Sequence, residues 1–210
     1  MYRFLFLPFV FFICNNIYAQ LSDDVLQMKV DVTYLASDLL EGRESGARGE
    51  QLAAEYIAER FAQLDLQPKG DSIWFQSFDF LFKSNPHAAT GEDRVGKNVI
   101  AYLDKGAKST VVIGAHYDHL GYGHFGSLYD GAPAIHNGAD DNASGIASLL
   151  YLAKELKTSD LNNNNYLFIG FSGEEMGLFG SKFFIQNATI DTASINYMIN
   201  MDMVGRLNKE

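Results

Sequence analysis

The chain has a single cysteine, an excess of acidic over basic residues and no apolar run long enough to cross a bilayer. The lone Cys14 excludes a disulfide bond within the chain. There are 16 lysine and arginine residues against 26 aspartate and glutamate residues, which gives a net charge of −10. Because nucleic-acid affinity comes largely from basic side chains, this balance argues against a nucleic-acid partner. With 47% apolar and 20% charged residues, the composition is that of a globular domain and excludes a disordered or low-complexity chain.

The first 19 residues have the pattern of a signal peptide. Arg3 gives a positive start, an eleven-residue apolar run extends from Phe4 to Cys14, and residues 17–19 resemble a cleavage site. A helix needs about 20 apolar residues to span a bilayer, so we expect no stable membrane insertion. Residues 1–19 are therefore predicted to be a signal peptide, and residues 20–210 to be exported to the periplasm or secreted.

Two alternatives remain open for this N-terminal segment. It could form a buried strand of the folded domain, or Cys14 could carry a lipid anchor. The bulky Ile13 directly before that cysteine argues against the anchor. Cleavage after Ala19 would remove the chain's only cysteine.

Apolar periodicity and turn residues predict an α/β fold. The helices are expected at residues 24–39, 50–65, 143–157 and 175–186, and the strands at residues 73–82, 99–103, 110–115, 166–171 and 197–201. The polar stretch 83–97 is expected to cross the surface. Strands that alternate with helices indicate a mainly parallel central sheet flanked by helices.

Potential metal ligands follow three predicted strands and precede one helix. They are His116 and Asp118, Glu174 and Glu175, Asp202, and the pair Asp140 and Asp141. Because ligand sites lie beyond the carboxyl ends of parallel strands, we expect these side chains to converge at one edge of the sheet.

Each of these four groups also has an ordinary structural explanation. Ser172 and Glu175 fit a capping box, and Asp141 or Asn142 could cap the next helix. Asp202 could close a turn and His116 could be a buried core histidine. Together, these explanations require four coincidences at the same edge, whereas a single metal site accounts for all of the residues.

The donor types suit a hydrolytic metal centre. One imidazole with several carboxylates suits zinc, or manganese or cobalt. A carboxylate can bridge two ions, which together activate water and polarise a peptide carbonyl. Adjacent Glu174 and Glu175 could then divide the tasks of base and ligand. Asp118 is placed to hold the second ring nitrogen of His116.

Four segments resemble the co-catalytic zinc aminopeptidase family, which includes aminopeptidase Y, bacterial leucyl aminopeptidases, glutamate carboxypeptidases and glutaminyl cyclases. The segments are residues 114–119 (GAHYDH), 137–145 (NGADDNASG), 171–178 (FSGEEMGL) and 200–202 (NMD). The resemblance covers about residues 30–205 and implies that residues 20–210 are a zinc peptidase catalytic domain acting on peptides.

The resemblance also implies roles for individual residues. His116 and Asp202 would bind one zinc ion, Glu175 the second, and Asp141 both, with Asp140 as the alternative register for the bridge. Glu174 would be the general base of a metal-bound hydroxide mechanism, and Asp118 the residue that orients His116. A cis peptide bond is expected between Asp141 and Asn142.

One ligand of the family is missing from the pattern. Members supply a last histidine to the second zinc ion from a later loop, but none of the five histidines here follows Asp202. The expectation is therefore a sequence truncated at its C-terminus, with His119, His124 or His136 as possible substitutes. The expected function is an exported aminopeptidase. A glutaminyl cyclase-like acyltransferase and an inactive fragment remain the alternatives.

Overall fold

The computed structural model describes residues 22–83 and 89–206, so the predicted signal peptide lies outside the described residues. Its helices are α1 (Asp23–Leu35), α2 (Arg48–Gln63), α3 (Gly145–Thr158) and α4 (Phe179–Gln186). Short helical turns occur at Asp38–Arg43, Ala139–Ser144 and Thr192–Ser194. The strands are β1 (Gln67–Pro68), β2 (Phe75–Phe82), β3 (Glu92–Leu103), β4 (Thr110–His116), β5 (Asn165–Phe171) and β6 (Ile195–Asn200).

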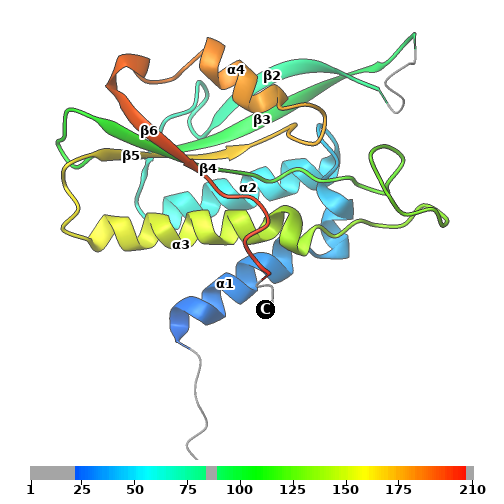
Figure 1. Ribbon diagram of the computed structural model, residues 1–210, viewed down its shortest axis with the longest axis horizontal. Coiled ribbons are helices and arrows are strands. Elements are labelled where there is room, and N and C mark those ends of the chain that lie inside the picture. The colour runs from blue at the N-terminus through cyan, green and yellow to red at the C-terminus, as the bar shows by residue number, and fades with distance from the viewer. Residues whose placement is uncertain (1–21, 84–88, 207–210) are drawn as a thin grey trace, which may run out of the picture.

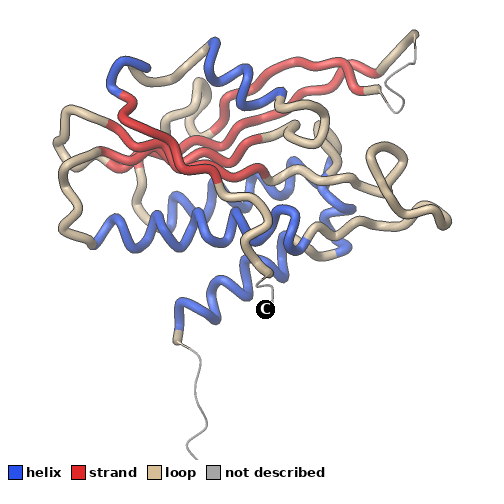
Figure 2. Tube along the Cα trace, in the orientation of Figure 1, coloured by secondary structure: helices blue, strands red, loops and turns tan. Residues whose placement is uncertain are grey.

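One central sheet organises the molecule, with helices on both faces (Figures 1 and 2). The strand order is β1-β3-β5-β4-β6, and β2 forms a hairpin with β3. Strands β5, β4 and β6 are parallel, whereas β3 is antiparallel to β5 and carries the antiparallel side of the sheet. This arrangement confirms the predicted α/β class.

The buried strands explain where the core sits. Every residue of β4 and β5 is buried, as expected for apolar strands covered on both faces. Helices α2 and α3 cover one face, where Ile146, Leu149 and Leu150 belong to the larger core. Helix α4 covers the other face through Phe184.

The carboxyl ends of the parallel strands meet at one edge. His116 at the end of β4 pairs in register with Phe171 at the end of β5. Gly114 of β4 pairs with Asn200 at the end of β6. The residues that follow these strands are therefore neighbours in space.

Several predicted boundaries differ from the structure, among them the end of the helix predicted at residues 24–39, which stops at Leu35, and two others have a clear local cause. The stretch 83–97 does not remain on the surface as a loop, because β3 begins at Glu92 and its first half pairs with β2. Helix α4 begins at Phe179, not at Glu175, because the intervening residues form a turn with positive φ at Gly177 and Leu178. In both places the local sequence is polar and does not indicate where the strand or helix begins.

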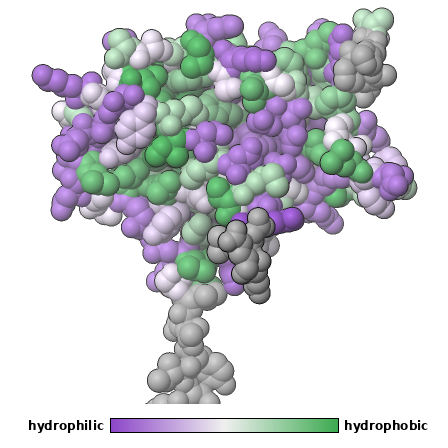
Figure 3. Space-filling view, viewed as in Figure 1, coloured by the Kyte–Doolittle hydropathy of each residue, from purple (hydrophilic) through white to green (hydrophobic). Residues whose placement is uncertain are grey.

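The surface of the molecule that faces the viewer in Figure 3 mixes polar and apolar side chains. Tyr197, Met198 and Ile199 of β6, the edge strand of the described sheet, are about half exposed. Within the described ranges, no helix combines the length and the apolar character needed to cross a membrane.

Candidate metal centre

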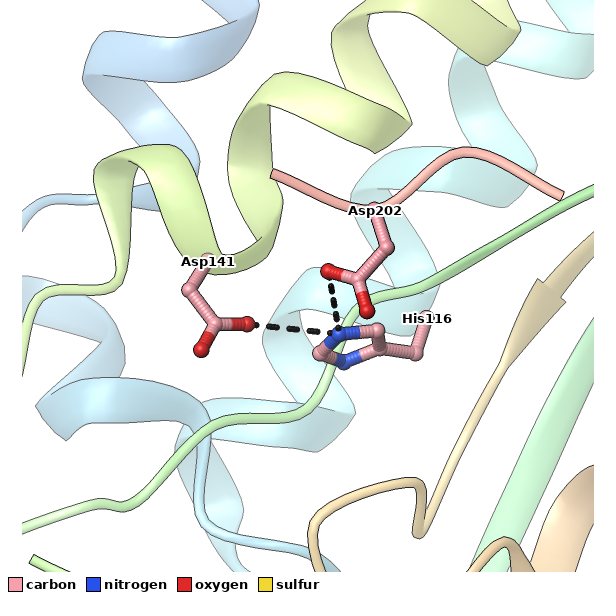
Figure 4. A group of neighbouring side chains, drawn as sticks. All are labelled: His116, Asp141 and Asp202. Carbon is pink, nitrogen blue, oxygen red and sulfur yellow. Dashed lines mark hydrogen bonds and ion pairs between the residues drawn. The ribbon is translucent and has the colours of Figure 1, made fainter. Parts of the chain in front are cut away.

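Two predicted carboxylate ligands from separate elements meet at one imidazole nitrogen of a third predicted ligand. Nε2 of His116 lies 3.3 Å from Asp141 Oδ1 and 3.4 Å from Asp202 Oδ1. Figure 4 shows both carboxylates directed at the same ring. Two ligands of a tetrahedral zinc ion, each about 2.0–2.1 Å from the metal, are separated by about 3.3–3.4 Å. The spacing and the donor types therefore fit a zinc ion.

A second group of donors adjoins the first through Asp141. Donor atoms of His119, Asp141 and Glu175 all lie within 4.8 Å of one another. Asp141 Oδ2 is 3.9 Å from His119 Nδ1, while its Oδ1 faces His116. The two oxygens of one carboxylate thus face two different donor groups, which is the arrangement that a bridging ligand requires.

The neighbouring Asp140 is engaged elsewhere. Its Oδ1 accepts a hydrogen bond from the Gly205 N–H at 2.9 Å, and its Oδ2 pairs with Arg206 at 3.2 Å. The structure therefore favours Asp141 over Asp140 in the bridging register. The peptide bond that follows, Asp141–Asn142, is cis, as the resemblance implied.

Asp118 lies against His116 but also has a second set of contacts. The Nδ1–H of His116 donates to the Asp118 carbonyl oxygen at 3.2 Å, and the carboxylate is 3.6 Å from the same nitrogen. The buried carboxylate accepts the backbone N–H groups of Glu174 at 3.0 Å and Glu175 at 3.2 Å. Asp118 therefore fixes the loop that carries both glutamates, which the sequence did not reveal.

The charges at the site are strongly coupled. Burial lowers the pKa of His116, but hydrogen bonds to Asp118 and Asp141 outweigh this effect and raise it to about 11. The hydrogen bond from His116 lowers the pKa of Asp141 against the opposing effect of burial. A proton on His116 thus balances the carboxylates in the place where a cation would do the same.

Glu174 stands apart from both donor groups and lines a cavity. The cavity has a volume of about 240 Å³ and is also lined by His116, Phe171, Leu178 and Met198. Burial raises the pKa of Glu174; His116 opposes this rise, and the carboxylates of Asp118 and Glu175 add to it. A carboxylate with a raised pKa beside a cavity suits proton transfer.

The contacts of these residues exclude some of their ordinary structural explanations. Ser172 does not form a capping box with Glu175, because α4 begins later and the Ser172 hydroxyl donates to the buried Glu50. Asn142, and not Asp141, bonds to the start of α3, since its Oδ1 accepts the Gly145 N–H at 3.0 Å. Asp141 is therefore left free to face the histidines.

Comparison with known proteins gives the family. The sequence model of peptidase family M28 matches residues 98–210, more than half of the chain. The chain belongs to peptidase family M28. The matched span contains all the predicted metal ligands and Glu174.

Curated M28 relatives are longer than this chain. The alkaline phosphatase isozyme conversion protein of Escherichia coli is 30% identical over 170 residues, covering 77% of this chain and 46% of that protein. A probable leucine aminopeptidase of Arthroderma otae is 34% identical over 116 residues, covering 53% of this chain and 30% of that protein. The chain therefore spans less than half the length of these relatives.

Solved structures share the M28 fold. A Zn-dependent exopeptidase from Parabacteroides distasonis superposes with a TM-score of 0.64 at 20% identity, covering 85% of this chain and 62% of that one. A glutaminyl cyclase from Porphyromonas gingivalis gives a TM-score of 0.63 at 18% identity, covering 87% and 61%. At these identities the similarity shows the fold.

Sequence patterns did not identify a buried arginine that lies beneath the M28 site. Arg43 is 1% exposed, and its guanidinium donates to backbone carbonyls of Tyr117, Asn137 and Gly138 at 2.7–2.9 Å, and also to Leu35. Burial lowers the pKa of Arg43 to about 10. The only local signal was a charged residue in a glycine-punctuated loop, a pattern that usually indicates exposure.

Proposed function

We propose that this protein is an exported, zinc-dependent aminopeptidase that removes N-terminal residues from peptides. The observation that carries the proposal is the placement of Asp141, whose two oxygens face separate donor groups. Such a carboxylate can hold two ions about 3.5–4 Å apart, the spacing of two-metal hydrolases. The probable leucine aminopeptidases among the relatives support cleavage of the peptide bond that follows the N-terminal residue.

The ligands divide between two cation positions. His116 and Asp202 would hold one zinc ion, Glu175 the other, and Asp141 both. Bound zinc supplies Lewis acidity, which polarises a peptide carbonyl and lowers the pKa of water. The N–H of His116 donates to the Asp118 carbonyl, so in the neutral ring the lone pair of Nε2 faces Asp141 and Asp202.

Glu174 performs the proton transfers. Its carboxylate takes a proton from the attacking water and then gives that proton to the leaving amine. The raised pKa of Glu174 suits a group that must both accept and release a proton. Asp118 holds its backbone N–H at 3.0 Å, which fixes the position from which the side chain reaches the cavity.

The Glu174→Gln variant tests this assignment. With zinc and an aminoacyl-anilide substrate, the purified 210-residue chain should release the free aniline, and the variant should lose at least about 100-fold in kcat. Zinc binding should remain, because Glu174 belongs to neither donor group. The exposed Glu155→Gln on α3 is the matched control and should keep wild-type turnover.

Other outcomes of this assay favour the alternatives. A chain that binds zinc but shows no turnover would support the inactive fragment. The shared fold makes glutaminyl cyclase the second candidate. A peptide with N-terminal glutamine separates the two enzymes, since hydrolysis releases free glutamine and cyclisation releases ammonia from an otherwise intact peptide.

Export rests on the N-terminal sequence pattern. Expression of the full chain in a bacterium with N-terminal sequencing of the exported product should give a mature chain that begins at Gln20. An uncleaved product retained inside the cell would contradict export.

A further inference from the structure

His119 and Glu175 lie closer together than two ligands of one zinc ion normally do. His119 Nδ1 is 2.7 Å from Glu175 Oε1. Tetrahedral zinc ligands are separated by about 3.3–3.4 Å, and the contacts of His116 with Asp141 and Asp202 have this spacing. A separation of 2.7 Å is instead that of a charge-assisted hydrogen bond. Because a carboxylate only accepts, the Nδ1 of His119 must carry the proton.

The backbone of His119 is fixed by the buried loop around Arg43. The His119 N–H donates to the Arg43 carbonyl at 2.9 Å, and His119 pairs with Glu44 as an isolated bridge. The side chain of His119 is 9% exposed, so water competes little for its ring. This anchoring gives the imidazole a set position from which to hold a partner.

Glu175 is held at both ends, in contrast to its neighbour. Its backbone N–H donates to Asp118 at 3.2 Å, and its carboxylate accepts from His119. Glu174 shares the Asp118 contact through its own N–H, but its side chain lines the cavity. The two adjacent glutamates therefore differ in their surroundings: the Glu175 carboxylate is hydrogen-bonded to His119, whereas Glu174 lines the cavity.

We propose that His119 is a positioning residue, whose hydrogen bond fixes the Glu175 carboxylate as a ligand of the second cation. This inference rests on the two-metal function proposed above. Glu175 is then a fixed ligand and Glu174 a proton-transferring base, although the two are adjacent in sequence. His119 acts through Glu175 and does not itself coordinate the ion, so that Asp141 and Glu175 are the two ligands that this donor group supplies to the second cation.

Metal binding by three histidine variants tests the proposal. Zinc stoichiometry and affinity are measured by isothermal titration, and Co²⁺ absorption spectra report the coordination. His119→Ala removes the donor, whereas His119→Asn places an amide N–H close to the position of Nδ1. His124→Asn, an exposed histidine of the following loop, is the matched control.

We expect the wild-type chain to bind two ions. His119→Ala should weaken only the weaker of the two sites, by roughly 10- to 100-fold, the usual effect of losing a residue that orients a ligand. His119→Asn should restore that site to within a few-fold of the wild type, with an unchanged Co²⁺ spectrum. The unaltered first site shows that each variant is folded.

Three results would overturn the inference, and a fourth concerns the function. If His119→Asn binds as weakly as His119→Ala and the Co²⁺ spectrum changes, His119 is itself a ligand. If His119→Ala binds both ions like the wild type, the hydrogen bond has no positioning role. If both sites weaken together, the effect is structural. A wild-type chain that does not bind two ions would instead refute the two-metal function, and this inference with it.

Discussion

Glu50 is a buried acid that no step of the reaction uses. It is 2% exposed, accepts the Gly46 N–H at 2.6 Å and accepts a hydrogen bond from the Ser172 hydroxyl. Burial raises the pKa of Glu50 to about 8, and the nearby charge of Asp118 adds to the rise. A neutral acid at this position avoids a second negative charge beside the carboxylate that holds the glutamate loop.

This pKa shift predicts a pH dependence of stability. The folded chain keeps the Glu50 proton up to about pH 8, whereas the unfolded chain releases it near pH 4.5. The contribution of Glu50 to the free energy of unfolding is thus fully present below pH 4.5 and falls as the pH rises to about 8. Glu50→Gln should make the decline less steep, by up to about 1.4 kcal/mol per pH unit.

Urea unfolding of the metal-free chain from pH 5 to pH 9 measures this slope. The exposed Glu55→Gln on the same helix is the control and should keep the wild-type slope. Equal slopes for Glu50→Gln and the wild type would show that Glu50 is ionised in the folded chain.

At the level of elements, a single side chain ties together three segments that approach the site. The Arg43 guanidinium binds the end of α1 at Leu35, the residue after β4 at Tyr117, and the end of the glycine-rich loop at Asn137 and Gly138. Asp141 lies three residues beyond that loop end. The short helical turn Asp38–Arg43 therefore helps to set the position of the proposed bridging ligand.

Arg43→Met should destabilise the fold by at least about 3 kcal/mol, because four backbone carbonyls lose their donor in a largely buried setting. Arg43→Lys should recover part of this loss, since an ammonium offers three donors without the planar fork. Denaturant unfolding measures both variants. The exposed Arg48→Met should stay within about 0.5 kcal/mol of the wild type. A similarly small effect of Arg43→Met would show that water can replace the guanidinium.

Sequence patterns predicted the elements that are buried on both faces better than those that are partly exposed. The continuous apolar runs of β4 and β5 gave both strands to within one residue. The first half of β3 was missed because its alternating polar residues pair only with β2 at the edge of the structure. The start of α4 was misplaced because a capping-box sequence there folds as a turn, in which Ser172 bonds to Glu50 across the molecule.

At the level of the whole molecule, the same distinction applies to the site. Residues that follow consecutive strands could be grouped in advance, because parallel strands bring their carboxyl ends to one edge. Sequence patterns could not place three buried polar residues beside this group, because each forms a hydrogen bond with a residue more than 70 positions away. These residues are Arg43, Ser45 and Glu50. Long-range burial of a charged side chain leaves no periodic signal in the local sequence, so only the structure reveals this layer beneath the ligands.

The proposed ions would link β4, β6, the glutamate loop and the turn before α3, so zinc should stabilise the whole fold. A ligand at 100 times its dissociation constant adds about 2.7 kcal/mol, which corresponds to a rise in Tm of roughly 5–10 °C for a chain of this size. Asp141→Asn should abolish most of this rise, because Asp141 contributes to both donor groups.

The adjacent Asp140→Asn provides the matched control for thermal unfolding with zinc or with EDTA. This substitution should lower the Tm of the metal-free chain, because the Asp140 carboxylate accepts a hydrogen bond from the Gly205 N–H and pairs with Arg206. The increment produced by zinc should nevertheless remain, since Asp140 belongs to neither donor group. If Asp140→Asn removed the increment and Asp141→Asn kept it, the bridging register would shift by one residue, and the two-sided geometry at Asp141 would not describe the metal-bound protein.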